Sequence, residues 1–119
     1  MLSLKEVNLV SDESPVPFTW IDNDHDLDLL LDRLQSQDRI ALDTEFHREK
    51  TYFPRLALIQ LAWLDGIAIV DPLSCDASKL RRIFGIQHLI ILHAAQQDLD
   101  VMTHAMGTVP ERIFDTQIA

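Results

Sequence analysis

Several residue types are scarce in this sequence, and each scarcity excludes a class of protein. The 119 residues include one cysteine, Cys75, so the chain forms no internal disulfide and we expect a reducing, cytoplasmic location. Three glycines and five prolines exclude collagenous, low-complexity and linker-dominated proteins. The longest apolar stretch, residues 56–64, is interrupted by Gln60 and is too short to cross a bilayer. Residues 1–10 lack the pattern of a secretory signal, so we expect neither export nor a membrane span.

Basic side chains are also outnumbered by acidic ones, and this imbalance of charge is uneven along the chain. Ten Lys and Arg residues stand against 19 Asp and Glu residues, which gives a net charge of −9. Residues 1–45 contain three basic and eleven acidic residues, whereas residues 46–119 are nearly balanced. An acidic total excludes a non-specific nucleic-acid coat protein, which requires a basic face. The second part nevertheless contains a local basic group, Arg48, Lys50 and Arg55.

The N-terminal part predicts an extended lead followed by one helix. Pro15 and Pro17 disfavour a helix, so we assign residues 1–20 to a lead that crosses a sheet edge or stays loose. Asn23 is a good N-cap residue, and the leucines that follow recur at helical spacing. We therefore expect an amphipathic helix that ends near Gln37.

The rest of the chain predicts a mixed α/β sheet with flanking helices. Three successive apolar segments favour an antiparallel meander, with Leu64-Asp65-Gly66 as a tight hairpin turn. Helical and strand-like segments then alternate, which is typical of helices packed on a sheet. The expected elements are strands at 39–46, 56–63, 67–70 and 89–92, helices at 78–84 and 96–106, a helix stop at Gly107, and the approach to a further element at 112–114.

The segment Ala41-Leu42-Asp43-Thr44-Glu45-Phe46 is the first that carries chemistry. Side chains alternate along a strand, so Asp43 and Glu45 lie on the same side with Cα atoms about 6.5–7 Å apart. Two ionised carboxylates at this spacing repel each other unless a cation lies between them or one keeps its proton. Oxygen ligands favour a hard divalent ion, Mg²⁺ or Mn²⁺. The structural alternative is that both carboxylates face water at a strand end.

A second acidic position follows the strand expected at 89–92. His93 ends this strand, and Asp98 lies in the first turns of the next helix, on the face beside the buried one. Small residues at 94–95 permit close approach of a backbone or a ligand. For His93 the structural alternative is a histidine whose hydrogen bonds are satisfied within the fold. For Asp98 it is a charge favoured by the helix N-terminus.

Taken together, these segments resemble the ribonuclease D family of 3′→5′ exonucleases, within the DEDD superfamily. The resemblance covers residues 20–119 and is most diagnostic between Asp43 and Leu61. It implies a ribonuclease H-like fold, which agrees with the mixed α/β order expected above. The matching segments are Asp43-Thr44-Glu45-Phe46 with Arg48, Thr51-Tyr52-Phe53-Pro54, Leu56-Ala57-Leu58-Ile59-Gln60-Leu61, His93-Ala94-Ala95-Gln96-Gln97-Asp98-Leu99, and Phe114-Asp115-Thr116-Gln117.

The resemblance implies a metal site and an RNA substrate. Asp43 and Glu45 match the family's first acidic motif and Asp98 matches the second, so all three are implied as catalytic, metal-holding carboxylates. The family hydrolyses phosphodiesters with two ions, Mg²⁺ or Mn²⁺, of which one activates the attacking water and the other stabilises the departing 3′ oxygen. RNA 3′ ends, such as those of tRNA precursors, are the implied substrates. The implied substrate-binding residues are Thr44, Phe46, Arg48, Tyr52 and His93, with Lys50, Phe53 and Arg55 as further candidates for phosphate or base contacts.

One motif of the family has no match in the sequence. The third acidic motif, Tyr-x-x-x-Asp on a later helix, is absent, since the single tyrosine is Tyr52. Asp115 does not replace it, because it matches an earlier Asp-Thr of the family and is expected to cap a helix. The C-terminal helical domain usual in ribonuclease D has no counterpart either. We therefore expect residues 21–119 to form part of an exonuclease domain, with weak activity or none by itself.

Two other functions stay open at this point. The first is a DNA-directed proofreading or repair 3′→5′ exonuclease of the same superfamily, because the contacts to the 2′-hydroxyl that select RNA are not located by the sequence. The second is a non-catalytic RNA-binding module. For Arg48 and its basic neighbours the structural alternative is a solvated surface position, and for Tyr52 and Phe53 it is packing in the core.

Overall fold

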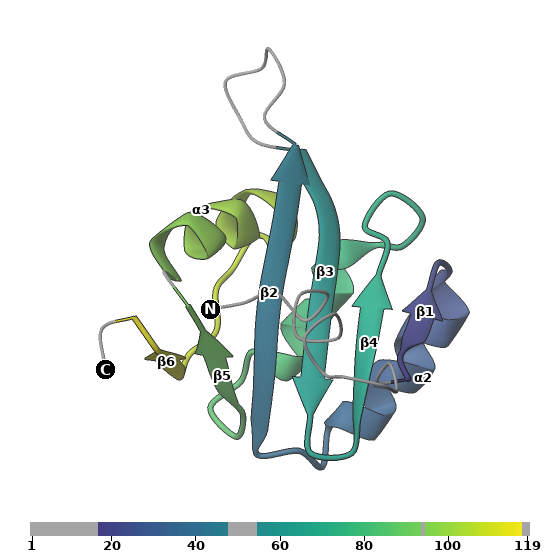
Figure 1. The fold of residues 1–119 in the computed structure, drawn as a ribbon, viewed down its shortest axis with the longest axis horizontal. Coiled ribbons are helices and arrows are strands. Elements are labelled where there is room, and N and C mark those ends of the chain that lie inside the picture. Colours follow the sequence, from purple (N-terminus) through teal and green to yellow (C-terminus); the bar gives the residue numbers. More distant parts are fainter. Residues whose placement is uncertain (1–16, 48–54, 94, 118–119) are drawn as a thin grey trace.

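Among the residues that the structure describes, six strands form one mixed sheet in the order β1-β4-β3-β2-β5-β6 (Figure 1). The structure is a computed structural model that describes residues 17–47, 55–93 and 95–117, without the side chains of residues 46–47, 55–56, 95–98 and 101. The mixed α/β sheet predicted from the sequence is confirmed. The strands are β1 (Thr19–Ile21), β2 (Arg39–His47), β3 (Arg55–Trp63), β4 (Gly66–Val70), β5 (Leu89–Leu92) and β6 (Ile113–Asp115).

The middle of the sheet is the antiparallel meander β2-β3-β4 that the sequence predicts. The turn between β3 and β4 consists of Leu64 and Asp65, and Gly66 is the first residue of β4. A Cβ atom at position 66 would lie 2.8 Å from Cζ2 of Trp63, closer than carbon atoms pack. The glycine is therefore required by the indole ring that folds back over it.

Parallel strands extend this meander on both sides. β1 pairs with β4 at one edge, while β5 pairs with β2 and then with β6 at the other. Residues 19–20 of the expected lead thus belong to a strand at the sheet edge, and residues 1–16 lie outside the described part of the chain. Because the partners of β1 and β5 are distant along the chain, these parallel pairings hold the meander and the strands β1, β5 and β6 in one layer.

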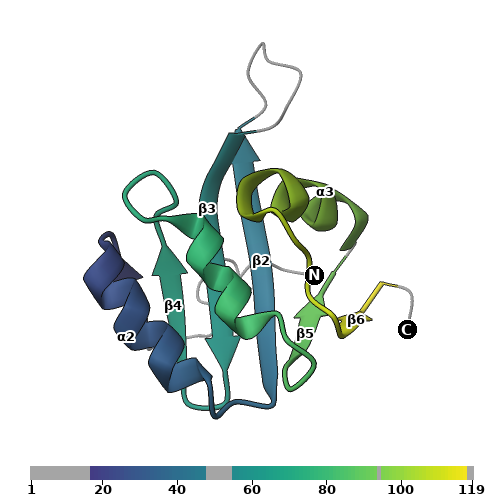
Figure 2. The ribbon, with the colours of Figure 1, turned by 180° about the vertical axis from the view of Figure 1, so that it is seen from behind.

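All three described helices cover the same face of the sheet, as the view from behind shows (Figure 2). They are α2 (Asp24–Leu34), the 3₁₀ helix η1 (Ala77–Ile83) and α3 (Ala95–Met106). The Asn23 side chain caps α2 by accepting a hydrogen bond from the Asp26 backbone N–H at 2.8 Å. The helix ends before the expected Gln37. No helix of the described residues is both long and apolar enough to cross a membrane.

Helix α3 ends as predicted at Gly107, whose φ of 77° suits glycine and stops the helix.

The covered face of the sheet holds the hydrophobic core. Each large apolar side chain that leaves water contributes about 1.5–3 kcal/mol to stability, so this layer dominates the fold energetically. Its largest fully buried members are Leu27, Leu31, Leu34, Ile40, Leu42, Ile59, Leu61, Leu80, Ile83, Ile90, Leu92 and Met102.

The opposite face of the sheet, which we call the open face, carries no helix among the described residues (Figure 1). In β2 the residues Ala41, Asp43 and Glu45 are half-buried, and they alternate with buried neighbours that face the core. Because strand side chains alternate, Asp43 and Glu45 both lie on the open face. The sheet thus separates an apolar core on one side from two carboxylates on the other.

Candidate functional site

Asp43 and Glu45 occupy the C-terminal half of the central strand β2. Their pairing with β3 places Asp43 opposite Gln60 and Glu45 opposite Leu58. The residue between them, Thr44, is 7% exposed and belongs to the core face. The Thr44 side chain therefore does not reach the carboxylate side, and only its backbone remains for the substrate contact that the sequence implies.

A change of register follows directly after Glu45. Glu45 pairs with Leu58 whereas Phe46 pairs with Leu56, so Ala57 is the extra residue on β3. Such β-bulges bend a strand, increase its twist and re-aim side chains, and they are frequent beside active sites. Glu45 is thus the last carboxylate-bearing position of the regular ladder, at the point where the strand changes direction.

Gln60 contacts this pair from the neighbouring strand. Its side chain is 0% exposed, although it lies on the open face. Its Nε2 atom donates a hydrogen bond to Oε1 of Glu45 at 3.1 Å. In the sequence, Gln60 interrupts an apolar stretch and belongs to the Leu56–Leu61 segment that resembles ribonuclease D, but nothing there assigns it a contact. The signal for its role is a polar residue within an apolar strand, but its partner is decided by the strand register.

His93 lies at the level of Asp43 on the adjacent parallel strand. Ala41 and Ile91 are register partners, and His93 follows Ile91 by two residues as Asp43 follows Ala41. The half-buried ring of His93 places Nδ1 2.9 Å from Oγ1 of Thr116. This contact orients the imidazole and joins the end of β5 to the end of β6.

Helix α3 starts two residues after His93, so its first turn lies beside the carboxyl end of β5 (Figure 2). Asp98 belongs to this first turn. The described part of the chain does not include its side chain, so the meeting of Asp98 with Asp43 and Glu45 stays a prediction. Asp115 ends β6, and its Oδ1 accepts a hydrogen bond from the Gln117 backbone N–H at 2.9 Å. That bond is of the kind expected from a turn or helix cap.

The remaining predicted substrate contacts are not located by the structure. Arg48, Lys50, Tyr52 and Phe53 lie outside the described residues. Phe46 and Arg55 have a described backbone, in β2 and β3 respectively, but their side chains are not described. The roles proposed for these residues therefore rest on the sequence alone.

The donor chemistry of the site fits a hard divalent cation. Asp43 and Glu45 offer carboxylate oxygens from one face of one strand, which is the ligand type that Mg²⁺ and Mn²⁺ prefer. Within the part of the chain that the structure describes, no group of three or more His, Cys, Asp or Glu side chains gathers as a metal site. Two of the three expected ligands are thus on one face, and the third is expected from α3.

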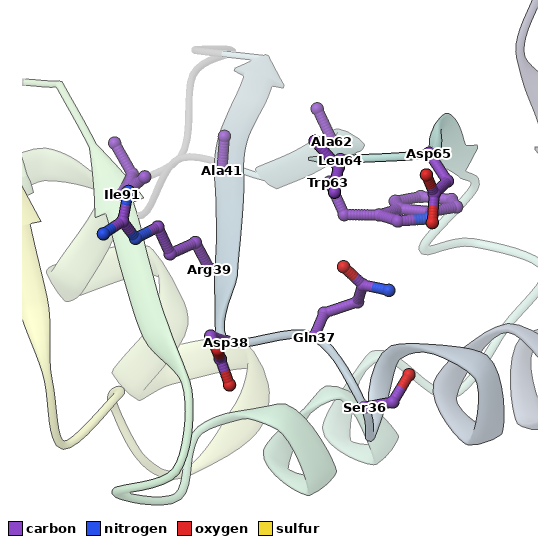
Figure 3. A pocket seen from close by; sticks show the side chains of 10 residues that line it. All are labelled: Ser36, Gln37, Asp38, Arg39, Ala41, Ala62, Trp63, Leu64, Asp65 and Ile91. Carbon is purple, nitrogen blue, oxygen red and sulfur yellow. The ribbon is translucent and has the colours of Figure 1, made fainter.

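A separate hollow of about 740 Å³ lies at the other end of the open face (Figure 3). Arg39 and Ile91 line one side of it, and Trp63 and Asp65 line the other. These residues belong to the start of β2 and the β3–β4 turn, whereas Asp43 and Glu45 lie toward the end of β2. The hollow therefore does not contain the carboxylate pair.

Comparison with known proteins connects this geometry to an activity class. A family profile described as 3′-5′ exonuclease matches residues 18–119. Ribonuclease D of Bartonella henselae is 41% identical over 98 residues, which are 79% of this chain and 24% of the relative. The curated relatives are much longer, and the chain spans about a quarter of their length.

Solved structures agree with the expected fold. Escherichia coli RNase D, an exoribonuclease involved in structured RNA processing, matches with a TM-score of 0.81 and 38% identity, over 86% of this chain and 28% of that one. Trypanosoma brucei RNase D in complex with RNA U12 matches with a TM-score of 0.76 and 19% identity, over 87% and 38%. The ribonuclease H-like fold and the resemblance to ribonuclease D are confirmed.

Proposed function

We propose that this chain, which belongs to the 3′-5′ exonuclease family, acts in the metal-dependent removal of nucleotides from RNA 3′ ends. The observation that carries the proposal is the pair Asp43 and Glu45, presented together on the open face within a chain that matches this family. Dependence on divalent metal ions is general among DEDD exonucleases. The activity is a proposal, because the chain spans only about a quarter of its curated relatives.

In this proposal Asp43, Glu45 and Asp98 hold Mg²⁺ or Mn²⁺. When bound, the ions would supply an activated water and charge stabilisation for the departing 3′ oxygen. The two β2 carboxylates contribute the negative charge that makes the binding of two neighbouring cations favourable. The strand fixes their spacing before any ion binds, so little conformational freedom is lost on binding.

Electrostatics makes the cations necessary for substrate binding as well. The chain carries a net charge of −9, which repels the RNA backbone. Asp43 and Glu45 would hold metal ions whose charge would offset this repulsion and favour phosphate. Arg48, Lys50 and Arg55 are the proposed phosphate contacts, while Tyr52 and Phe46 are proposed to stack on terminal bases. His93, held by Thr116, is proposed to contact the terminal nucleotide.

RNA is the proposed substrate, with tRNA precursors as the first to be tested. The named relatives are ribonucleases D, and one of them has been solved with bound RNA. A cytoplasmic location belongs to the proposal because a single cysteine suits a reducing compartment.

The test uses a 5′-labelled RNA 12-mer incubated with the chain and Mn²⁺, with EDTA as the metal-free reference. We expect a slow ladder of products shortened from the 3′ end. Asp43→Asn should reduce the rate by about a hundredfold or more, because a metal ligand supplies several kcal/mol of charge stabilisation. The matched control is Asp65→Asn, an exposed carboxylate on the β3–β4 turn. Unchanged cleavage by Asp43→Asn at the same Mn²⁺ concentration would remove Asp43 from the mechanism.

The same assay separates the two alternative functions. Faster degradation of a matched DNA 12-mer would favour a DNA-directed exonuclease. Binding of RNA without cleavage would favour a non-catalytic RNA-binding module. Fluorescence anisotropy with labelled RNA measures this binding independently of cleavage.

A further inference from the structure

Gln60 is a polar side chain in a place where burial makes polar groups costly. It is the one polar residue of β3 after Arg55, and its exposed fraction is 0%. A buried amide is destabilising unless its hydrogen-bonding groups find partners. An apolar residue would fill this position without that requirement, so the amide itself requires an explanation.

The Gln60 amide lies beside both carboxylate positions of β2. Its backbone is the register partner of Asp43, and its Nε2 donates to Oε1 of Glu45 at 3.1 Å. Glu45 is diagonal to Gln60 across the strand pair, a separation that long side chains bridge. Among the described residues, Oε2 of Glu45 makes no hydrogen bond or ion pair. The Gln60 bond therefore holds one oxygen of the carboxylate.

The chemistry of the donor matters as much as its position. A lysine or arginine at position 60 would neutralise Glu45 and compete with a cation for it. A neutral amide orients the carboxylate and keeps its full negative charge. Orientation is needed here because the regular ladder ends at Glu45, where the bulge begins. A glutamate side chain has several rotatable bonds that the strand backbone does not fix.

We infer that Gln60 is a positioning residue that holds Glu45 in the conformation required for binding a divalent cation. This inference rests on the proposed function, since it assigns Glu45 to a metal site. It adds to the three carboxylates a neutral residue that touches neither cation nor RNA. Loss of partners that orient metal ligands typically weakens metal binding 10- to 100-fold.

The experiment measures Mn²⁺ affinity of the full 119-residue chain by EPR of free Mn²⁺, together with the melting temperature. Gln60→Leu removes the donor and keeps the approximate volume, and Gln60→Met is the second variant in case the first does not fold. We expect an affinity about tenfold weaker than that of the wild-type chain. The matched control, Gln87→Leu, changes an exposed glutamine and should bind Mn²⁺ as the wild type does.

A second background tests whether the effect acts through Glu45. Glu45→Asp keeps a carboxylate but shortens it, so the bond to Gln60 is lost. In this background Gln60→Leu should change the affinity by less than about twofold, because coupled residues are not additive. In the metal-free chain, Glu45→Asp should also shift the NMR signals of the Gln60 side-chain amide, whereas Asp65→Asn should leave them unchanged.

The outcomes separate the two proposals. If Gln60→Leu and Gln60→Met bind Mn²⁺ as tightly as the wild type while melting lower, Gln60 is only structural and the inference is overturned. If Asp43→Asn also binds Mn²⁺ like the wild type, the metal site and the proposed function fail. An equal effect of Gln60→Leu in the wild-type and Glu45→Asp backgrounds would show that Gln60 acts without Glu45.

Discussion

Replacing Gly66 by alanine tests the packing that closes the β3–β4 hairpin. The new Cβ atom would lie 2.8 Å from Cζ2 and 3.2 Å from Cε2 of Trp63. Because the indole is rigid and packs against the core, either the ring must rotate or the strand must move. Overpacking of this kind costs about 1–3 kcal/mol, and the reduced freedom of the unfolded chain offsets about 0.4–1 kcal/mol. We expect the free energy of unfolding to fall by about 1–2 kcal/mol.

For a chain of this length, that loss corresponds to a melting temperature lower by about 4–8 °C. Urea unfolding followed by circular dichroism measures the free energy directly. Tryptophan fluorescence reports the ring itself, and a Trp20→Phe background leaves Trp63 as the one indole. The emission of Trp63 should change in Gly66→Ala even under conditions where the chain is fully folded.

The other two glycines of the chain are internal controls. A Cβ atom at Gly85 would lie 2.5 Å from Oε1 of Gln87, but this is the end of a flexible, exposed side chain that can move away. Gly85→Ala should therefore stay within about 0.5 kcal/mol of the wild type. Gly107 has open space around it but a φ of +77°, so alanine there should cost about 1 kcal/mol through backbone strain. A loss of unfolding free energy in Gly66→Ala no larger than that in Gly85→Ala would show that the Trp63 ring does not require glycine at position 66.

Two further predictions concern titratable groups away from the site. Burial raises the pKa of the Cys75 thiol, and nearby carboxylates such as Asp24 add to this effect. Iodoacetamide should modify Cys75 at least about tenfold more slowly in the native chain than in the urea-unfolded chain. Mass spectrometry measures both rates, and equal rates would contradict this prediction. Hydrogen bonds from the Ser78 hydroxyl and backbone lower the pKa of Asp76 below its ordinary 3.8. This stabilisation is present above pH 3.8 and is lost as the pH falls through the folded-state pKa. Asp76→Asn should reduce the loss of melting temperature on acidification, whereas Asp38→Asn should not. Identical profiles of melting temperature against pH for the wild type and Asp76→Asn would reject the assignment.

The candidate site divides into a part that local sequence decides and a part that it does not. Alternation along a strand is enough to place Asp43 and Glu45 on one face, because it depends only on neighbouring residues. The same alternation applies to Thr44, whose side chain lies on the core face although the family resemblance suggested a substrate contact. The contact of Gln60 with Glu45 depends on how two strands align, and the bulge after Glu45 is part of that alignment.

The sequence by itself determined the helices and the strands β2 to β5, with most of their ends to within a residue or two, but not β1 or β6. Asn23 and the leucine spacing specify α2, and Leu89–Leu92 specifies β5, because caps and hydrophobic periodicity act over a few neighbouring residues. Only the tertiary structure decided that β1 pairs in parallel with β4, that His93 contacts Thr116, and that the carboxylates lie opposite the helices. The physical reason is that partners far apart in the chain are selected by the packing of the whole sheet, which no short segment encodes.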